Sequence, residues 1–252
     1  LELRTAICKY LKELKGTSYG VDQVMVACGG KQAIYEVVLA TCREGDEVVI
    51  PAPYYTSHPD IVILSGASPV ILPTLAADDY VPNVAGLEAV LTPRTRMLIL
   101  CNPCNPTGTV IGAAQLEALA AVLRRPEHAH VLVLADEIYS EITYDVPHIS
   151  FAALPGMMER TLTINGGRPH TRPRPTVVAM AMLAMRCMLS MCPAHHGLRS
   201  LHAMLTSTRL LQVARHDGLP PRLPRRPQGA GQGRHAAAGA DHLVRPPPPL
   251  PP

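Results

Sequence analysis

Four short segments of this 252-residue sequence could bind a ligand, and each follows a run of apolar residues. The first is Cys28-Gly29-Gly30-Lys31-Gln32, which lies between an expected strand and an expected helix. Glycines there let the backbone approach an anion, and the start of a helix supplies unpaired N–H donors and a positive dipole end. The segment therefore indicates either a phosphate-binding turn or a plain tight turn.

The second and third segments would supply an aromatic ring and an amide. In Pro51-Ala52-Pro53-Tyr54-Tyr55, two prolines stiffen a turn that could aim a tyrosine into a crevice, although by itself the segment favours a core aromatic pair. In Asn102-Pro103-Cys104-Asn105-Pro106-Thr107-Gly108, two Asn-Pro steps and a glycine predict a rigid loop that holds a side-chain amide for hydrogen bonding. A turn without a ligand is the alternative for this loop.

The fourth segment, Asp136-Glu137-Ile138-Tyr139, places a carboxylate at the end of an apolar strand. Burial of such a group is costly unless a cation or several hydrogen bonds compensate it. Tyr139 follows Asp136 by three positions, so a helical turn would put both on one side. The segment fits a ligand-binding carboxylate or, equally, a helix N-cap with an incidental tyrosine.

The elements that must position these segments alternate between strands and helices. Apolar runs predict strands at Val24–Ala27, Glu47–Ile50, Pro69–Pro73, Arg96–Leu100, Val131–Leu134 and Thr161–Ile164. Helical periodicity predicts helices at Leu1–Lys15, Lys31–Cys42 and Ala113–Arg125. Apolar strands alternating with helices predict an α/β fold, with a mostly parallel sheet and helices on both faces. The loops after the strands would then share one edge, where ligands bind.

The composition changes abruptly after Gly167. Residues 1–167 have a net charge of −7 and residues 168–252 a net charge of +10, which together give the +3 of the whole chain. All nine aromatic residues lie at or before Phe151, and 14 of the 26 prolines follow Gly167. We therefore divide the chain into a folded domain at 1–167 and an Arg/Pro/Ala-rich tail at 168–252. Without aromatic residues the tail cannot offset its ordering entropy, and we expect disorder, with one possible helix at Thr176–Cys192.

Several function classes fit this composition poorly. The longest apolar run, Val177–Met191, is interrupted by Arg186 and is too short to span a bilayer, so we expect no membrane segment. The seven cysteines do not have the spacing of a disulfide framework, which favours reduced thiols inside a cell. The lone pair Cys101 and Cys104 is weak evidence for zinc, and the spacing of Cys187, Cys192, His195 and His196 matches no standard zinc pattern, so we predict no metal site.

In this order, GGKQ, PAPYY, NPCNPTG and DEIY resemble the class I aminotransferases of the aspartate aminotransferase fold, which use pyridoxal 5′-phosphate (PLP). The phrases GDEVVIPAPYY, PRTRMLILCNPCNPTG and VLADEIYSEITYD look most like the aspartate/prephenate aminotransferases of bacteria and plastids. The resemblance covers about Leu1 to Gly167. It implies an incomplete large domain of the PLP-dependent transferase fold type I.

The resemblance assigns cofactor-binding roles to six residues. It implies that Gly30 and Lys31 give backbone N–H groups to the phosphate and that Tyr55 stacks on the pyridine ring, where the family usually has a tryptophan. It implies that Asp136 pairs with the pyridine nitrogen and keeps it protonated, so that the cationic ring absorbs electrons from the substrate carbanion. Asn105 and Tyr139 would hydrogen-bond the 3′-oxygen of the cofactor.

The pattern breaks after Gly167, where the family has the lysine that forms the Schiff base. The resemblance places that lysine at position 169, which is Pro169, and a phosphate-binding arginine near Val177. The last lysine of the chain is Lys31, and arginine does not replace a primary amine. We therefore predict no catalytic residue, PLP held non-covalently at best, and no useful transamination. We interpret the switch as a frameshift, with a natural divergent tail as the alternative.

The resemblance also implies amino acid and 2-oxo acid substrates such as aspartate and glutamate, a possible homodimer, and a cytoplasmic or plastid location. Because the chain begins with Leu1, we expect it to be a piece of a longer protein. C–S lyases and aminocyclopropane-carboxylate synthases share these motifs and remain alternatives within the family. Outside it, the alternative is a non-catalytic module that binds PLP or a partner, with a basic tail for acidic surfaces; we expect little nucleic-acid binding, because the tail has no aromatic residues for stacking.

Overall fold

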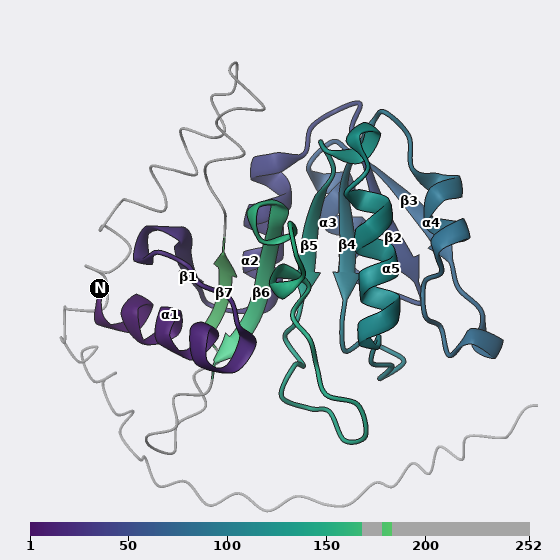
Figure 1. The fold of residues 1–252 in the computed structure, drawn as a ribbon. Coiled ribbons are helices and arrows are strands. Elements are labelled where there is room, and N and C mark those ends of the chain that lie inside the picture. Colours follow the sequence, from purple (N-terminus) through teal and green to yellow (C-terminus); the bar gives the residue numbers. More distant parts are fainter. Residues whose placement is uncertain (168–177, 183–252) are drawn as a thin grey trace, which may run out of the picture. The chain divides into compact units, whose positions relative to one another are not determined.

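The apolar runs of the sequence form one seven-stranded sheet in the computed structural model, which describes residues 1–167 and 178–182 (Figure 1). The strands are β1 (Val24–Ala27), β2 (Glu47–Ala52), β3 (Ser68–Pro73), β4 (Thr95–Cys101), β5 (Leu132–Asp136), β6 (Thr161–Gly167) and β7 (Val178–Met182). Their order is β1-β7-β6-β5-β4-β2-β3. The pairs from β3 to β6 are parallel, and β7 is antiparallel to both β6 and β1. All described residues belong to one compact unit.

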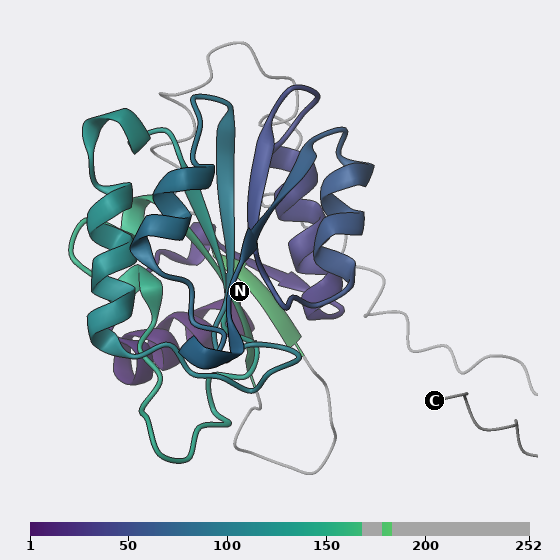
Figure 2. The ribbon, with the colours of Figure 1, turned by 90° about the vertical axis from the view of Figure 1, so that its right-hand side faces the viewer.

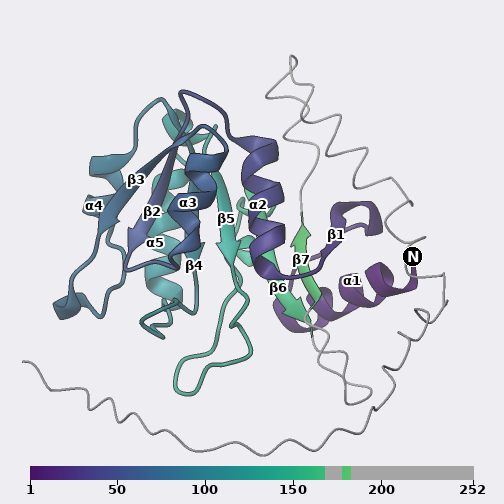
Figure 3. The ribbon, with the colours of Figure 1, turned by 180° about the vertical axis from the view of Figure 1, so that it is seen from behind.

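Helices cover both faces of this sheet, as the views from the side and from behind show (Figures 2 and 3). They are α1 (Glu2–Lys15), α2 (Gly30–Thr41), α3 (Ser57–Leu64), α4 (Val84–Val90) and α5 (Ala113–Leu123). Helices α2 and α3 lie on one face, and α4 and α5 lie on the other. Helix α1 packs against β1 through Ile7, Leu11 and Val24.

The alternation of side chains along each strand divides the core between the two faces. On β4, Met97 and Ile99 pack toward α2 and α3, whereas Leu98 and Leu100 pack toward α5. Because the strand is buried on both faces, every one of these four positions is apolar. This explains why the sequence shows continuous apolar runs instead of an apolar–polar alternation.

The predicted fold class is confirmed, and every predicted strand and helix at 1–167 is present within a few residues of its expected bounds. The sequence reading missed α3 and α4. The predicted helix at Thr176–Cys192 is wrong for Val178–Met182, which form β7 between β1 and β6. These five residues belong to the tail that we expected to be disordered, and its other residues lie outside the described part of the chain.

Within the described residues, no helix has the length and apolar character needed to cross a membrane.

The loop that follows β5 is attached to the domain by a buried carboxylate. Glu137 is 1% exposed, and its Oε1 accepts hydrogen bonds from Ser150 Oγ at 2.9 Å and from the Phe151 N–H at 3.0 Å. Its Oε2 lies 3.7 Å from Nε2 of the buried His148. Burial raises the pKa of Glu137 to about 7 and lowers the pKa of His148 to about 4. Both directions favour an uncharged pair inside the domain.

We predict that Glu137 makes the free energy of unfolding depend on pH between about 4.5 and about 7. In this range the folded state keeps a proton on Glu137 that the unfolded state releases, so this group's contribution to stability grows as pH falls through 7 and is complete below about 4.5. Glu137→Gln keeps the acceptor oxygen and removes the titration. In urea unfolding, the wild type should gain stability relative to this variant between about pH 8 and about pH 5. Equal pH profiles for the two proteins would contradict the raised pKa.

Candidate functional site

The four ligand-binding segments of the sequence meet at one edge of the sheet. Strands β2, β4 and β5 are parallel, and β1 runs in the same direction because β7 is antiparallel to both β1 and β6. The loops that follow β1, β2, β4 and β5 therefore leave the sheet on the same side. In Figure 1 this is the lower edge, from which the long loop after β5 descends. An α/β sheet binds its ligands at this edge.

All six sequence-predicted residues line one cavity of about 200 Å³ at that edge. They are Gly30, Lys31, Tyr55, Asn105, Asp136 and Tyr139. The apolar side chains of Ile34 and Ile138 complete the lining. A concave site with a few convergent polar groups among apolar side chains is typical of small-molecule binding.

The start of α2 forms one wall of the cavity. The helix begins at Gly30, after an N-cap residue, Gly29, that has no side chain to cap it. The Gln32 side chain instead accepts a hydrogen bond from the Cys28 N–H at 3.0 Å, which fixes the turn before the helix. The first N–H groups of α2 are thus left for a ligand, and an anion would also gain from the helix dipole.

Tyr55 lies next to Lys31, and both residues line the cavity. Lys31 Nζ is 5.6 Å from the centre of the Tyr55 ring, a distance typical of a cation–π contact. Hydrogen bonds from Ser57 and then from Lys31 lower the pKa of Tyr55. The ring of His58 meets Tyr55 edge-on, with the ring centres 5.4 Å apart and the planes at 89°. These contacts hold the Tyr55 ring in a defined orientation at the cavity.

Asp136 is the buried carboxylate of the site, and it is only 4% exposed. Its Oδ2 lies 3.4 Å from His58 Nε2 and 3.8 Å from Cys101 Sγ, and its Oδ1 accepts a 3.4 Å hydrogen bond from the Ile138 N–H. Within the described part of the chain, no lysine or arginine forms an ion pair with Asp136. The carboxylate therefore faces the cavity without a strong cationic partner.

His58 is a residue of this site that the sequence reading missed. It is 1% exposed and lies in the first turn of α3, and its Nε2 has no hydrogen-bond partner among the described residues, although it lies 3.4 Å from Asp136 Oδ2. The signal was the spacing: His58 follows Tyr55 by three residues, so a helical turn would bring both to one side. That signal was lost because α3 was not predicted.

Asn105 and Tyr139 lie on the two loops that face each other at the open side. The Asn105 loop is closed by backbone hydrogen bonds from the Cys104 N–H to the Thr109 oxygen at 2.9 Å and from the Gly108 N–H to the Cys104 oxygen at 2.8 Å. Asn105 is half-buried, and Tyr139 is 38% exposed. A ligand between the loops would meet an amide and a phenol together.

The donor set fits PLP. The cofactor carries a phosphate, an aromatic ring and a ring nitrogen that is cationic when protonated. For these three groups the cavity offers a helix N-terminus, a tyrosine ring and a carboxylate that has no lysine or arginine partner among the described residues. The donor set does not suggest a metal. Among the described residues, no group of three or more His, Cys, Asp or Glu side chains could hold a metal ion. Outside the described residues lie the other positions that the sequence analysis discussed: Pro169, Val177, Cys187, Cys192, His195 and His196.

Comparison with known proteins agrees with the motifs. The family model for aminotransferase class I and II matches residues 1–167. The bifunctional aspartate aminotransferase and glutamate/aspartate-prephenate aminotransferase of Petunia hybrida is 50% identical over 167 residues, which are 66% of this chain and 34% of that protein. The aspartate/prephenate aminotransferase of Cereibacter sphaeroides is 41% identical over 167 residues, 66% of this chain and 41% of that protein.

A solved structure agrees in fold. The aspartate aminotransferase of Rhizobium meliloti has a TM-score of 0.68 and 33% identity, over 84% of this chain and 56% of that one. The chain thus spans about a third to two fifths of the two curated relatives named above. Since the family model matches 167 of the 252 residues, the chain belongs to the class I and II aminotransferases.

Proposed function

We propose that this chain carries the cofactor-recognition half of an aspartate- or glutamate-dependent aminotransferase and binds PLP without a covalent bond. The observation that carries the proposal is the convergence of four sequence segments on one cavity, where Asp136 is a buried carboxylate without a lysine or arginine partner among the described residues. The donor types match the groups of PLP, as the family membership leads one to expect.

Each residue has a role in this proposal. The N–H groups of Gly30 and Lys31 bind the phosphate, and the Tyr55 ring stacks on the pyridine ring. Asp136 pairs with the ring nitrogen and keeps it protonated, while Asn105 and Tyr139 hydrogen-bond the 3′-oxygen. When bound, the protonated cofactor ring supplies an acceptor for the electrons of a substrate carbanion.

The chain as written should bind the cofactor without catalysing transfer. The family's Schiff-base lysine would fall at Pro169, and no lysine follows Lys31. A lysine at that position supplies both the amine for the covalent bond and the base that moves the proton, so its loss removes two functions. The second candidate function is therefore a non-catalytic module that holds PLP or a partner, with a tail whose net charge of +10 suits acidic surfaces.

The substrates and partners of the whole enzyme follow from the relatives. The Petunia and Cereibacter proteins are named for aspartate, glutamate and prephenate transamination. We accordingly propose amino acids such as aspartate or glutamate and 2-oxo acids as substrates, and a homodimer as the assembly. A cytoplasmic or plastid location is part of the same proposal.

The first test is to resequence genomic and transcript DNA across the codons for Thr161 to Thr176. We expect an insertion or deletion whose correction restores a lysine at position 169. The true product would then be an ordinary aminotransferase in this region, and the tail an artefact. An unchanged reading frame would contradict the frameshift and leave the non-catalytic module as the function.

A second test measures cofactor recognition by the chain as it stands. Pyridoxine 5′-phosphate keeps the ring nitrogen and the phosphate but lacks the aldehyde, so it cannot react with surface lysines. Asp136→Asn should weaken its binding about tenfold or more in equilibrium dialysis, because a charge-assisted hydrogen bond is replaced by a neutral one. Asp60→Asn, on the exposed side of α3, is the matched control and should bind like the wild type. Equal affinity of the wild type and Asp136→Asn would refute the role of Asp136.

A third test concerns His58 as a positioning residue. His58→Phe fills the same buried space but removes the group beside Asp136 Oδ2, so the carboxylate should lose orientation and binding should weaken about threefold to tenfold. His58→Gln, which keeps an N–H donor, should restore part of the affinity. A purely structural role predicts instead that urea unfolding changes in His58→Phe while the affinity of the folded protein does not.

A further inference from the structure

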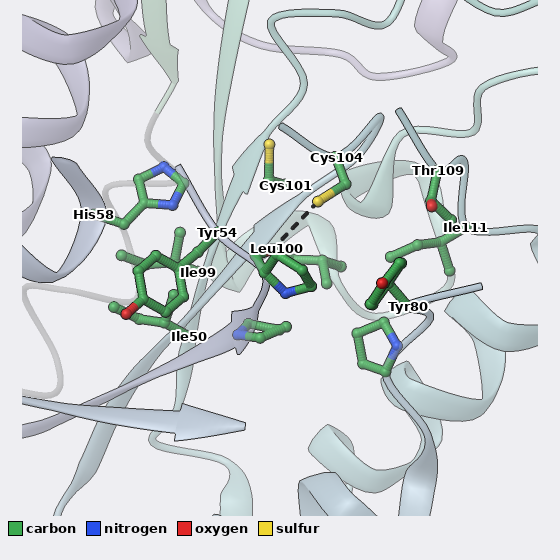
Figure 4. A pocket seen from close by; sticks show the side chains of 13 residues that line it. Ile50, Tyr54, His58, Tyr80, Ile99, Leu100, Cys101, Cys104, Thr109 and Ile111 are labelled. Carbon is green, nitrogen blue, oxygen red and sulfur yellow. Dashed lines mark hydrogen bonds between the residues drawn. The ribbon is translucent and has the colours of Figure 1, made fainter. Parts of the chain in front are cut away.

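Two cysteines lie on the wall of a small enclosed cavity beside the candidate cofactor site (Figure 4). Cys101 is the last residue of β4, and Cys104 follows it by three positions. The cavity has a volume of about 20 Å³, and His58 and Tyr54 also line it. Both cysteines are half-buried and both are free thiols.

The contacts of the two sulfur atoms are weak ones. Cys101 Sγ lies 3.4 Å from the Pro103 oxygen, and Cys104 Sγ lies 3.6 Å from the Pro53 oxygen, the contact dashed in Figure 4. Thiols are weak hydrogen-bond donors, so each of these two contacts contributes little free energy. The backbone bends at Asn102 and Pro103 between them, and both side chains end at the same cavity. The two thiols, three residues apart in the sequence, therefore line one and the same cavity.

The environments of the two thiols differ. Burial raises the pKa of Cys101 and the negative charge of Asp136 raises it further, whereas a hydrogen bond from the Asn105 backbone lowers it. Cys104 also lines an open groove of about 700 Å³ between its own loop and the loop of Tyr139 and Tyr144. A reagent in this groove therefore meets Cys104, because Cys101 is not part of the groove lining.

We propose that Cys101 and Cys104 are a redox pair that closes to a disulfide when a low-molecular-weight disulfide, such as oxidised glutathione, enters the groove. The Cys104 thiolate attacks one glutathione sulfur, and the other leaves as a thiol after it takes up a proton. Cys101 then loses its proton and attacks Cys104 Sγ, which releases the second glutathione thiol. Two protein thiols are oxidised, and one glutathione disulfide is reduced to two thiols.

The disulfide would also change the candidate cofactor site, a consequence that rests on the proposed function. Cys101 Sγ lies 3.8 Å from Asp136 Oδ2, and Cys104 directly precedes Asn105. Formation of the disulfide would remove the thiol hydrogen beside Asp136 and displace Cys104, the residue before Asn105. Oxidation should therefore lower the affinity for the cofactor.

Peptide masses of the full chain test the disulfide without any cofactor. Trypsin releases Met97–Arg124, which contains Cys101 and Cys104 and no other cysteine, and Gly16–Lys31, which contains only the exposed Cys28. The chain is kept in oxidised glutathione until Cys28 carries a glutathione adduct. Met97–Arg124 should then be lighter by two hydrogen atoms, carry no adduct and resist alkylation until it is reduced. A stable adduct on Met97–Arg124, or two alkylated thiols in it, would overturn the proposal.

Single variants separate the two thiols. In Cys101→Ser, Cys104 should keep a glutathione adduct because no second thiol displaces it. In Cys104→Ser, Cys101 should remain a free thiol under the same treatment. An adduct on Cys101 in Cys104→Ser would contradict the order of attack and with it the pair as proposed.

The effect on the site is measured separately, with pyridoxine 5′-phosphate. The oxidised wild type should bind it about fivefold more weakly than the reduced wild type, and the double variant Cys101→Ser/Cys104→Ser should show no such difference. Equal binding by the oxidised and reduced wild type would overturn this consequence. Absence of binding by the reduced wild type would refute the proposed function instead, while the peptide masses still decide on the disulfide.

Discussion

The site depends on a carboxylate buried at the end of a central strand. Asp136 is 4% exposed, and its protein neighbours are an imidazole 3.4 Å away, a thiol at 3.8 Å and one long backbone hydrogen bond. These contacts are weak for a group whose burial is costly without strong partners. In its present surroundings the carboxylate is under-compensated, and a cationic N–H group in the cavity would supply the missing partner. The groups around it belong to α3, to β4 and to the loop that follows β5, so the architecture of the sheet edge sets its environment.

Whether the sequence could predict a given part of the fold or of the site depends on the physical origin of that part. The strands could be predicted because burial on both faces requires unbroken apolar runs. The four ligand segments could be predicted because glycine, proline and aspartate directly follow such runs. Helix α3 was not visible, since Pro59 lies near its start and its last four residues, Ile61–Leu64, are all apolar, so no amphipathic period appears. With α3 missed, His58 was missed as well.

The prediction for the segment that forms β7 failed for the opposite reason. Its sequence, Val-Ala-Met-Ala-Met, is rich in good helix formers, and local preference therefore favoured a helix. The structure instead pairs it with β6 on one side and β1 on the other, and each of these pairs supplies backbone hydrogen bonds that the local sequence does not encode. Tertiary pairing overrides a weak local preference, and a single sequence carries no sign of it. The same pairing joins β1, and with it the start of α2, to the rest of the sheet.

The family pattern ends after Gly167. This point lies between the residues that we propose to bind the cofactor and the position where the family has its reacting lysine. The residues that we propose to hold the phosphate, the ring and the 3′-oxygen all precede β6 in the chain, and the sheet that aligns them is built almost entirely from residues up to Gly167. The amine that the family requires would come from the segment immediately after β6, where this chain has Pro169. Under the proposed function, a change of sequence at that point would remove the reacting group and leave the recognition geometry in place. For this reason cofactor affinity and turnover are separate quantities in this chain, and a measurement of one does not decide the other.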